Sequence, residues 1–124
     1  MRLLLDTHVV LWWLAGDQRL GGDLKGVIEH EPDVFLSSAS VWEIAVKSAQ
    51  GCLPGPTDLP ERVLAAGLPT LDINARHGIV AARLPLHHRD PFDRMLVAQA
   101  ITEDLTLVTR DREVQQYEVA LLHA

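Results

Sequence analysis

The sequence predicts an α/β fold in which helices cover both faces of a mostly parallel sheet of four to five strands. Two observations support this prediction. Short apolar runs alternate along the chain with longer segments of helical period, a pattern typical of right-handed βαβ units. Two of the apolar runs are followed by an aspartate, and open α/β sheets keep their ligand sites just beyond the carboxyl ends of their strands.

The first half of the chain begins with an apolar run at residues 2–5, which has the form of a buried parallel strand. A helix should follow at residues 7–15 and end at Gly16. A second helix at residues 22–31 and a second strand at residues 33–37 complete this half of the pattern.

The predicted helix at residues 7–15 has no polar face between residues 9 and 14. An all-apolar helix has to be covered on every side, so it is either a central core helix or one whose Trp12 or Trp13 reaches a partner surface. The uninterrupted apolar run, residues 9–15, is far shorter than the roughly 20 residues that cross a bilayer. We therefore interpret it as part of the fold.

A third helix is predicted at residues 39–50, with Ser38 or Ser40 as its cap. On a helical wheel its apolar residues share one broad face, which we expect to meet the core: Val41, Trp42, Ala45, Val46 and Ala49. Glu43 and Lys47 fall on the opposite face, spaced for an exposed ion pair. Glu43 is thus expected off the core.

The remaining elements continue the alternation of helices and strands. We expect helices at residues 58–66 and 74–84, and strands at residues 69–73, 105–109 and 117–122. Asn74 is a suitable cap for its helix, and Asp90 directly before Pro91 starts a further helix whose apolar pattern continues to Leu105. Residues 51–56 have turn chemistry and are too short for an interdomain linker.

Length and composition suit one domain over residues 1–124, since 48% of the residues are hydrophobic and no composition break divides them. The single cysteine, Cys52, cannot form an internal disulfide, which favours the cytoplasm. The net charge of -6 argues against a protein that grips nucleic acid mainly by counterion release. A nucleic-acid enzyme is still compatible with it, because divalent cations bound by the acids would cancel part of that charge.

The acids of interest each have an ordinary structural explanation when taken alone. They can cap helices or turns, form an exposed ion pair, or favour the positive end of a helix dipole. Their joint placement suggests more, because Asp6 and Asp111 both follow predicted parallel strands and Asp93 begins the helix that leads into the second of those strands. Glu43 lies in the helix after another strand. Carboxylates gathered in this way repel one another unless a cation is bound, and Mg²⁺ and Mn²⁺ prefer oxygen ligands.

Four motifs in order carry a resemblance to a known family: Leu4-Leu5-Asp6-Thr7-His8, Ser37-Ser38-Ala39-Ser40-Val41-Trp42-Glu43-Ile44, Asp90-Pro91-Phe92-Asp93-Arg94 with Leu96-Val97-Ala98-Gln99-Ala100, and Thr109-Arg110-Asp111. The chain resembles the PIN-domain ribonucleases, and within them the VapC-type toxins of bacterial toxin-antitoxin pairs. The resemblance spans nearly the whole chain, and the order and spacing of the motifs make it specific.

The resemblance implies a PIN-like three-layer α/β/α sandwich and an endoribonuclease that hydrolyses RNA phosphodiester bonds with Mg²⁺ or Mn²⁺. Asp6, Glu43, Asp93 and Asp111 match the family's acidic metal-binding quartet. Asp90 matches a further acid of the subgroup and ranks fifth among the candidate metal ligands. Homodimerisation and neutralisation by a small antitoxin are implied as well. One or two metal ions are equally compatible with this set.

Other residues near the acids are candidates for supporting roles. The hydroxyls of Thr7 and Thr109 can hold carboxylates in orientation, or act as local caps. Basic residues could contact RNA phosphates, with these as the main candidates: Lys47, Arg94 and Arg110. The histidines nearby, among them His88, lack metal-ligand spacing, so no zinc site is expected.

Two alternatives stay open. A phosphoacceptor signalling domain of the receiver type has a similar length, sheet and acidic Mg²⁺ pocket. It requires an acid pair after the first strand and a lysine at the end of a late strand, whereas here Asp6 precedes Thr7 and the late strand ends at Thr109-Arg110. A catalytically silent PIN-like binding module is the other alternative, and the presence of all four acids argues against it.

Overall fold

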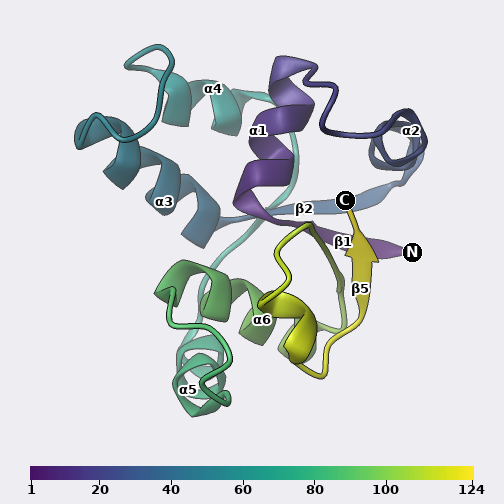
Figure 1. Cartoon of the computed structure of the whole chain (residues 1–124), viewed down its shortest axis with the longest axis vertical. Helices are drawn as coiled ribbons and strands as arrows, with labels where there is room; N and C mark the ends of the chain where they lie inside the picture. The colour runs from purple at the N-terminus through teal and green to yellow at the C-terminus, as the bar shows by residue number, and fades with distance from the viewer.

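The computed structural model describes all 124 residues and is built around a single sheet with helices on both sides (Figure 1). Its strands are β1 (Arg2–Leu5), β2 (Asp33–Ser37), β3 (Thr70–Leu71), β4 (Thr106–Thr109) and β5 (Leu121–His123). They lie in the order β3-β2-β1-β4-β5, and every neighbouring pair is parallel. The prediction of a mostly parallel sheet is confirmed.

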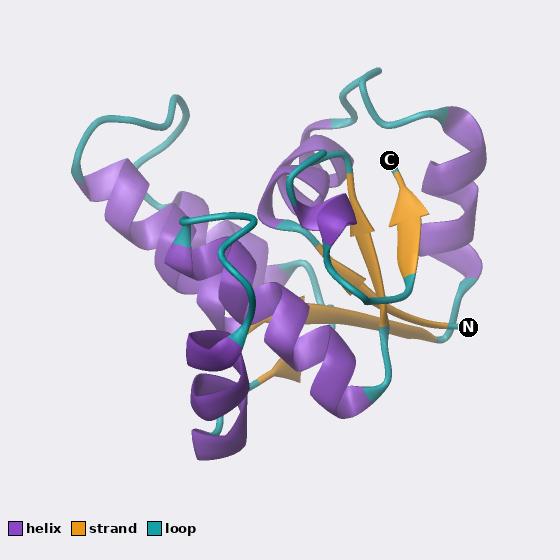
Figure 2. Ribbon diagram, turned by 60° about the horizontal axis from the view of Figure 1, so that its bottom comes forward, coloured by secondary structure: helices purple, strands orange, loops and turns teal.

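Helices cover the two faces of the sheet in two groups, which Figure 2 shows from the side. The helices on one face are α1 (Thr7–Ala15), α2 (Gly22–His30), α3 (Ser38–Ala49) and α4 (Leu59–Ala65). Those on the other face are α5 (Ala75–Arg83) and α6 (Pro91–Glu103). Alternate residues of β1 supply the two cores, because Leu3 and Leu5 face the first group while Leu4 faces the second. The result is the expected three-layer α/β/α sandwich.

Several predicted boundaries are confirmed by their local chemistry. Gly16 ends α1 in the left-handed conformation, with φ at 62°. Asn74 caps α5, and Nδ1 of His77 accepts a hydrogen bond from the backbone N–H of Asn74. Asp90 caps α6 ahead of Pro91, as predicted.

Three local predictions are wrong. The cap of α3 is Ser37, whose Oγ accepts a hydrogen bond from the backbone N–H of Ala39, and not Ser38 or Ser40. β3 has only two residues. The last strand does not begin at Tyr117, because the tyrosine ring packs in the second core and its hydroxyl donates to the carbonyl oxygen of Pro85, 2.8 Å away.

The orientation predicted for α3 is also wrong. Trp42 is 61% exposed, whereas Glu43 is only 3% exposed. The apolar face on the helical wheel therefore does not coincide with the buried face, which comprises Ala39, Ser40, Glu43 and Ile44. Glu43 can be buried as a carboxylate because the side chains of Thr7 and Lys47 both bond to it.

Helix α1 is not covered on every side. Val9 and Val10 are buried, while Trp12 and Trp13 are half-buried against the first core and Leu14 is exposed. Helices long and apolar enough to span a membrane are absent from the structure.

Candidate active site

The site lies at the carboxyl edge of the two central strands. β1 and β4 are paired in register, with Leu5 opposite Val108, and the backbone N–H of Asp6 continues the pairing by donating to the carbonyl oxygen of Val108 at 2.9 Å. Asp6 directly follows β1, and Asp111 follows β4 by two residues. Parallel pairing therefore brings these two acids to the same edge of the sheet.

Helix α6 adds a third acid from the opposite layer. Asp90 caps the helix and accepts hydrogen bonds from the backbone N–H groups of Phe92 and Asp93. Burial, followed by the negative charges of Asp6 and Asp90, raises the pKa of Asp93 from 3.8 to about 7. The charge of Glu43 acts in the same direction. These acids, predicted from separate motifs, therefore lie close enough to one another for their charges to interact.

Glu43 reaches the site from α3 and is fully engaged by its neighbours. Its Oε1 accepts a 2.7 Å hydrogen bond from the hydroxyl of Thr7, which is also 3.0 Å from the hydroxyl of Ser40. Its Oε2 is paired with Nζ of Lys47 at 2.5 Å, and this bond raises the pKa of Lys47. The predicted ion pair thus exists, but its acid is buried instead of exposed.

Asp6 is held in a different way, as the cap of α1. Its Oδ1 accepts from the backbone N–H of His8 at 2.9 Å, and its Oδ2 accepts from the hydroxyl of Thr109 at 2.6 Å. Burial by itself would raise the pKa of Asp6, but the hydrogen bonds with His8 and Thr109 outweigh burial and lower it. Asp6 is therefore ionised under conditions in which Asp93 is partly protonated.

His88 is a residue of the site that the sequence reasoning missed. Its Nε2 lies 2.9 Å from Oδ2 of Asp93 and 3.0 Å from Oδ2 of Asp111, and its Nδ1 lies 3.1 Å from Oε2 of Glu113. Burial lowers the pKa of His88, but the bond to Asp111 and the surrounding negative charges raise it overall. One signal for it was available in the sequence: a histidine stands two residues before Asp90, the acid that starts α6.

Comparisons with known proteins show which family the chain belongs to. The family model of the PIN domain matches residues 3–120. Over 120 residues the chain is 32% identical to Ribonuclease VapC22 of Mycobacterium tuberculosis, covering 93% of this chain and 91% of that protein. The chain belongs to the PIN-domain family, in its VapC branch.

Solved structures show the same fold. VapBC2 from Rickettsia felis, bound to a DNA fragment from its promoter, matches with a TM-score of 0.74 and 16% identity, covering 99% of this chain and 98% of that one. DNA-bound VapBC from Salmonella typhimurium matches with a TM-score of 0.70 and 17% identity, covering 99% and 98%. The PIN fold expected from the motifs is therefore shown.

The basic residues near the acids of this PIN domain differ in their availability. Lys47 is occupied by Glu43. The guanidinium of Arg94 points inward, where Nη2 donates to the carbonyl oxygens of Ala81 and Leu84 at 2.8 and 2.9 Å. Arg110 is exposed and lies over the ring of Trp12. Among the predicted phosphate contacts, Arg110 is thus the one whose side chain is open to a ligand.

The PIN-domain acids fit a hard divalent cation. Ligand atoms of His88, Asp93 and Asp111 all lie within 4.8 Å of one another, and the buried carboxylate of Asp6 belongs to the same edge. Because the pKa of Asp93 is raised mainly by burial and by neighbouring acids, a cation bound among them would relieve both effects. The donors are carboxylate oxygens with one imidazole nitrogen, that of His88, which the sequence prediction did not include.

Proposed function

We propose that this protein is a Mg²⁺- or Mn²⁺-dependent endoribonuclease of the VapC toxin type, which hydrolyses phosphodiester bonds in RNA and is neutralised by a cognate antitoxin. The observation that carries the proposal is the convergence of acids from four separate segments at one sheet edge, where burial and the neighbouring carboxylates raise the pKa of Asp93 to about 7. The name of the relative, a VapC ribonuclease, supports it. In this proposal residues 1–124 form one PIN domain that acts in the cytoplasm.

The acids would have different roles, set by their surroundings. Asp6, Asp93 and Asp111 would hold the metal, with Asp90 as a further candidate ligand, and Glu43 would hold it or orient the attacking water. When bound, the metal would supply charge neutralisation for the phosphate and acidify a water molecule. The rest is done by this chain's own side chains, which fix the carboxylates before the substrate arrives.

Two hydroxyls do this fixing. Thr109 donates to Asp6 and Thr7 donates to Glu43. Each threonine thus restrains a carboxylate from another part of the chain. Such partners keep ligand atoms in one orientation and preserve the geometry on which the reaction depends.

The deciding experiment is cleavage of a total RNA pool by the purified protein with EDTA, Mg²⁺ or Mn²⁺. Asp6→Ala and Asp93→Ala are the test variants, and Asp33→Ala, an exposed acid at the start of β2, is the matched control. We expect cuts at discrete positions that require metal, disappear in both test variants and persist in the control. Failure to cut RNA in any metal would move the assignment to a binding module or to a phosphoacceptor, and phosphoryl transfer to Asp6 would be measured next.

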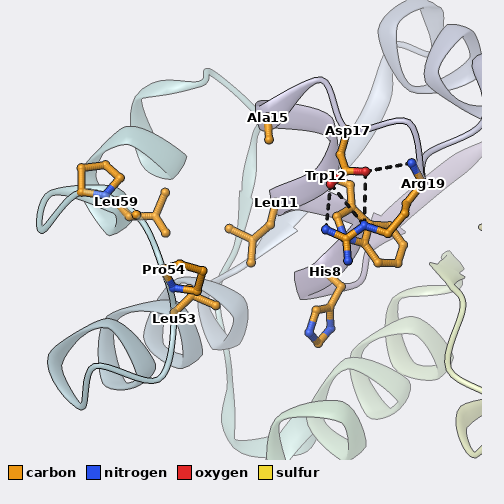
Figure 3. Close-up of a pocket in the computed structure, with 11 residues that line it drawn as sticks. His8, Leu11, Trp12, Ala15, Asp17, Arg19, Leu53, Pro54 and Leu59 are labelled. Carbon is orange, nitrogen blue, oxygen red and sulfur yellow. Dashed lines mark hydrogen bonds and ion pairs between the residues drawn. The ribbon is translucent and has the colours of Figure 1, made fainter.

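A groove beside α1 supports the antitoxin part of the proposal. It has a volume of about 480 Å³ and runs between α1, α4 and the loop before α4 (Figure 3). Its walls are largely apolar, with Leu11, Leu53, Pro54 and Leu59 among them. The neighbours of similar fold are toxin-antitoxin complexes, and an apolar groove of this kind suits an amphipathic helix.

Substitution of Trp12 or Trp13 in α1 tests both antitoxin binding and homodimerisation. We expect Trp12→Ala or Trp13→Ala to weaken antitoxin capture or to change the oligomeric state, measured by co-purification and light scattering. If both variants fold and neither property changes, the tryptophans belong to no partner interface.

A further inference from the structure

A second hollow, of about 290 Å³, opens directly beside the acids. Asp6 and Asp111 form one side of it, and it extends between the first two turns of α1 and the segment after β4. The other lining residues are His8, Val9, Trp12 and Arg110. Its volume is close to the lower limit of small-molecule sites, about 300 Å³, so the hollow suits one small group, such as part of a single nucleotide.

Arg110 brings a positive charge to the wall of the hollow. Its Nε donates to the backbone oxygen of Ala124 at 2.8 Å, and its Nη2 donates to the carbonyl oxygen of Arg19. Neither partner is an aspartate or glutamate side chain. The neighbouring Arg19, in contrast, is paired with the carboxylate of Asp17 at 2.7 Å. Of these two arginines, Arg110 is therefore the one that forms no ion pair with a side-chain carboxylate.

Trp12 fixes the position of that charge. The guanidinium carbon of Arg110 lies 4.5 Å from the centre of the Trp12 ring, a cation–π contact that restricts the long side chain. Two backbone acceptors hold it from the other direction. Because two bonds use only part of the five N–H groups of a guanidinium, the remaining donors are available to an anion. An arginine held in this way loses little conformational entropy when it binds one.

His8 adds an aromatic surface one helical turn before Trp12. Its side chain is 63% exposed. The ring centres of His8 and Trp12 are 6.2 Å apart and their planes are inclined by 43°, so the two rings are not stacked. Figure 3 shows the imidazole projecting away from α1. A nucleobase or ribose can therefore pack against it.

We propose that this hollow binds the nucleotide next to the scissile phosphate, with Arg110 contacting the phosphate of that nucleotide and His8 packing against its base or ribose. The inference rests on the proposed ribonuclease function. The hollow shares Asp6 and Asp111 with the candidate metal site, so a chain cut at those acids has to pass through or beside it. The hollow adjoins the groove beside α1 and shares His8 and Trp12 with it, but only the hollow is lined by Asp6, Arg110 and Asp111.

Arg112 provides a matched control, because it is exposed, stands two residues from Arg110, and has no side-chain hydrogen bond or ion pair. The probe is a fluorescent RNA oligonucleotide spanning the strongest cut found in the RNA pool. Binding is measured in an Asp93→Asn background with Mg²⁺, so that the probe stays intact, and cleavage is measured in the otherwise native protein.

We expect Arg110→Gln to weaken RNA binding about tenfold and to make the dependence of log K on log salt shallower by about 0.7, the value for one phosphate contact on a single strand. In cleavage, KM should rise about tenfold while kcat changes less than twofold. His8→Ala should weaken binding about threefold and leave the salt dependence unchanged, because it removes stacking and no phosphate contact. Arg112→Gln should behave like the native protein in each measurement.

The outcomes separate this inference from the function on which it rests. If the native protein cuts RNA but Arg110→Gln matches Arg112→Gln in affinity and salt dependence, the nucleotide site is wrong and the ribonuclease function still holds. If the Arg110→Gln and His8→Ala variants keep RNA binding but are no longer neutralised by the antitoxin, the hollow is a binding site for the antitoxin instead. Native protein that neither binds nor cuts RNA would overturn both. Melting temperatures of all variants exclude misfolding as the cause of a loss.

Discussion

The hydroxyl of Thr109 donates a 2.6 Å hydrogen bond to Oδ2 of Asp6, across 103 positions of the sequence. The same hydroxyl accepts a 3.0 Å bond from the backbone N–H of Asp111. One buried side chain at the end of β4 therefore connects two of the candidate metal ligands. Its bond to Asp6 also helps to keep the pKa of that acid low.

Thr109→Val tests this connection with little change in shape. Asp6 would lose its 2.6 Å donor, so we expect kcat/KM for RNA to fall by about 10- to 100-fold, the usual effect of removing a partner that orients a metal ligand. Stability should fall by about 1–3 kcal/mol, because buried polar groups lose a partner. Thr106→Val, on the same strand and without a side-chain hydrogen bond, should leave the activity unchanged. Equal activity in the two variants would contradict the orienting role.

Asp93→Asn tests the crowding of the acids without metal. Because folding raises the pKa of Asp93 from 3.8 to about 7, the folded state holds this proton more tightly than the unfolded state. The contribution of Asp93 to stability is thus fully present below pH 3.8 and is lost as the pH rises to about 7. We expect metal-free Asp93→Asn to lack this loss, and at pH 8 to be as stable as the native protein or more stable by on the order of 1–2 kcal/mol, while cutting no RNA.

The measurement is melting temperature against pH in EDTA, repeated with Mg²⁺. Added metal should raise the native protein's melting temperature most at the higher pH, where Asp93 is ionised. Asp33→Asn, which changes an exposed acid, serves as the control and should follow the native curve. A large drop in the metal-free melting temperature of Asp93→Asn would show that this acid supports the fold.

The parts of this fold that the sequence predicted are those set by local patterns. Apolar runs such as residues 2–5 predict buried strands. Because the two central strands are parallel, the acids that follow them lie at the same edge of the sheet. Capping by Asn74 and Asp90 likewise depends only on neighbouring residues. Such features can be read without knowing how the layers pack.

The features that sequence reasoning missed depend on contacts between distant segments. Glu43 was placed on the solvent side of its helix because a helical wheel cannot show that Thr7, 36 positions earlier, offers it a bond in the interior. His88 was set aside because its spacing matches no metal motif, yet the loop that carries it brings its ring between Asp93 and Asp111. In both cases a polar side chain is held by at least one partner from another element.

Lys47→Met tests the buried charge of Glu43. The substitution keeps the length and packing of the side chain but removes the cation 2.5 Å from the carboxylate. We expect the metal-free protein to lose about 2–4 kcal/mol of stability, measured by urea unfolding, because Glu43 would be left buried without its counter-charge. Lys25→Met, at an exposed position of α2 without an ion pair, should cost less than about 0.5 kcal/mol. Similar losses in both variants would mean that solvent already screens Glu43.

Arg94→Ala tests whether this arginine serves the fold instead of the RNA. Its guanidinium donates to the carbonyl oxygens of Ala81 and Leu84 and to those of Pro85 and His88, so its loss leaves backbone acceptors without a partner in the loop that carries His88. We expect a loss of about 2–4 kcal/mol in urea unfolding, against less than about 0.5 kcal/mol for the exposed Arg89→Ala. If Arg94→Ala instead keeps full stability but binds RNA more weakly and with a shallower salt dependence, Arg94 is a phosphate contact.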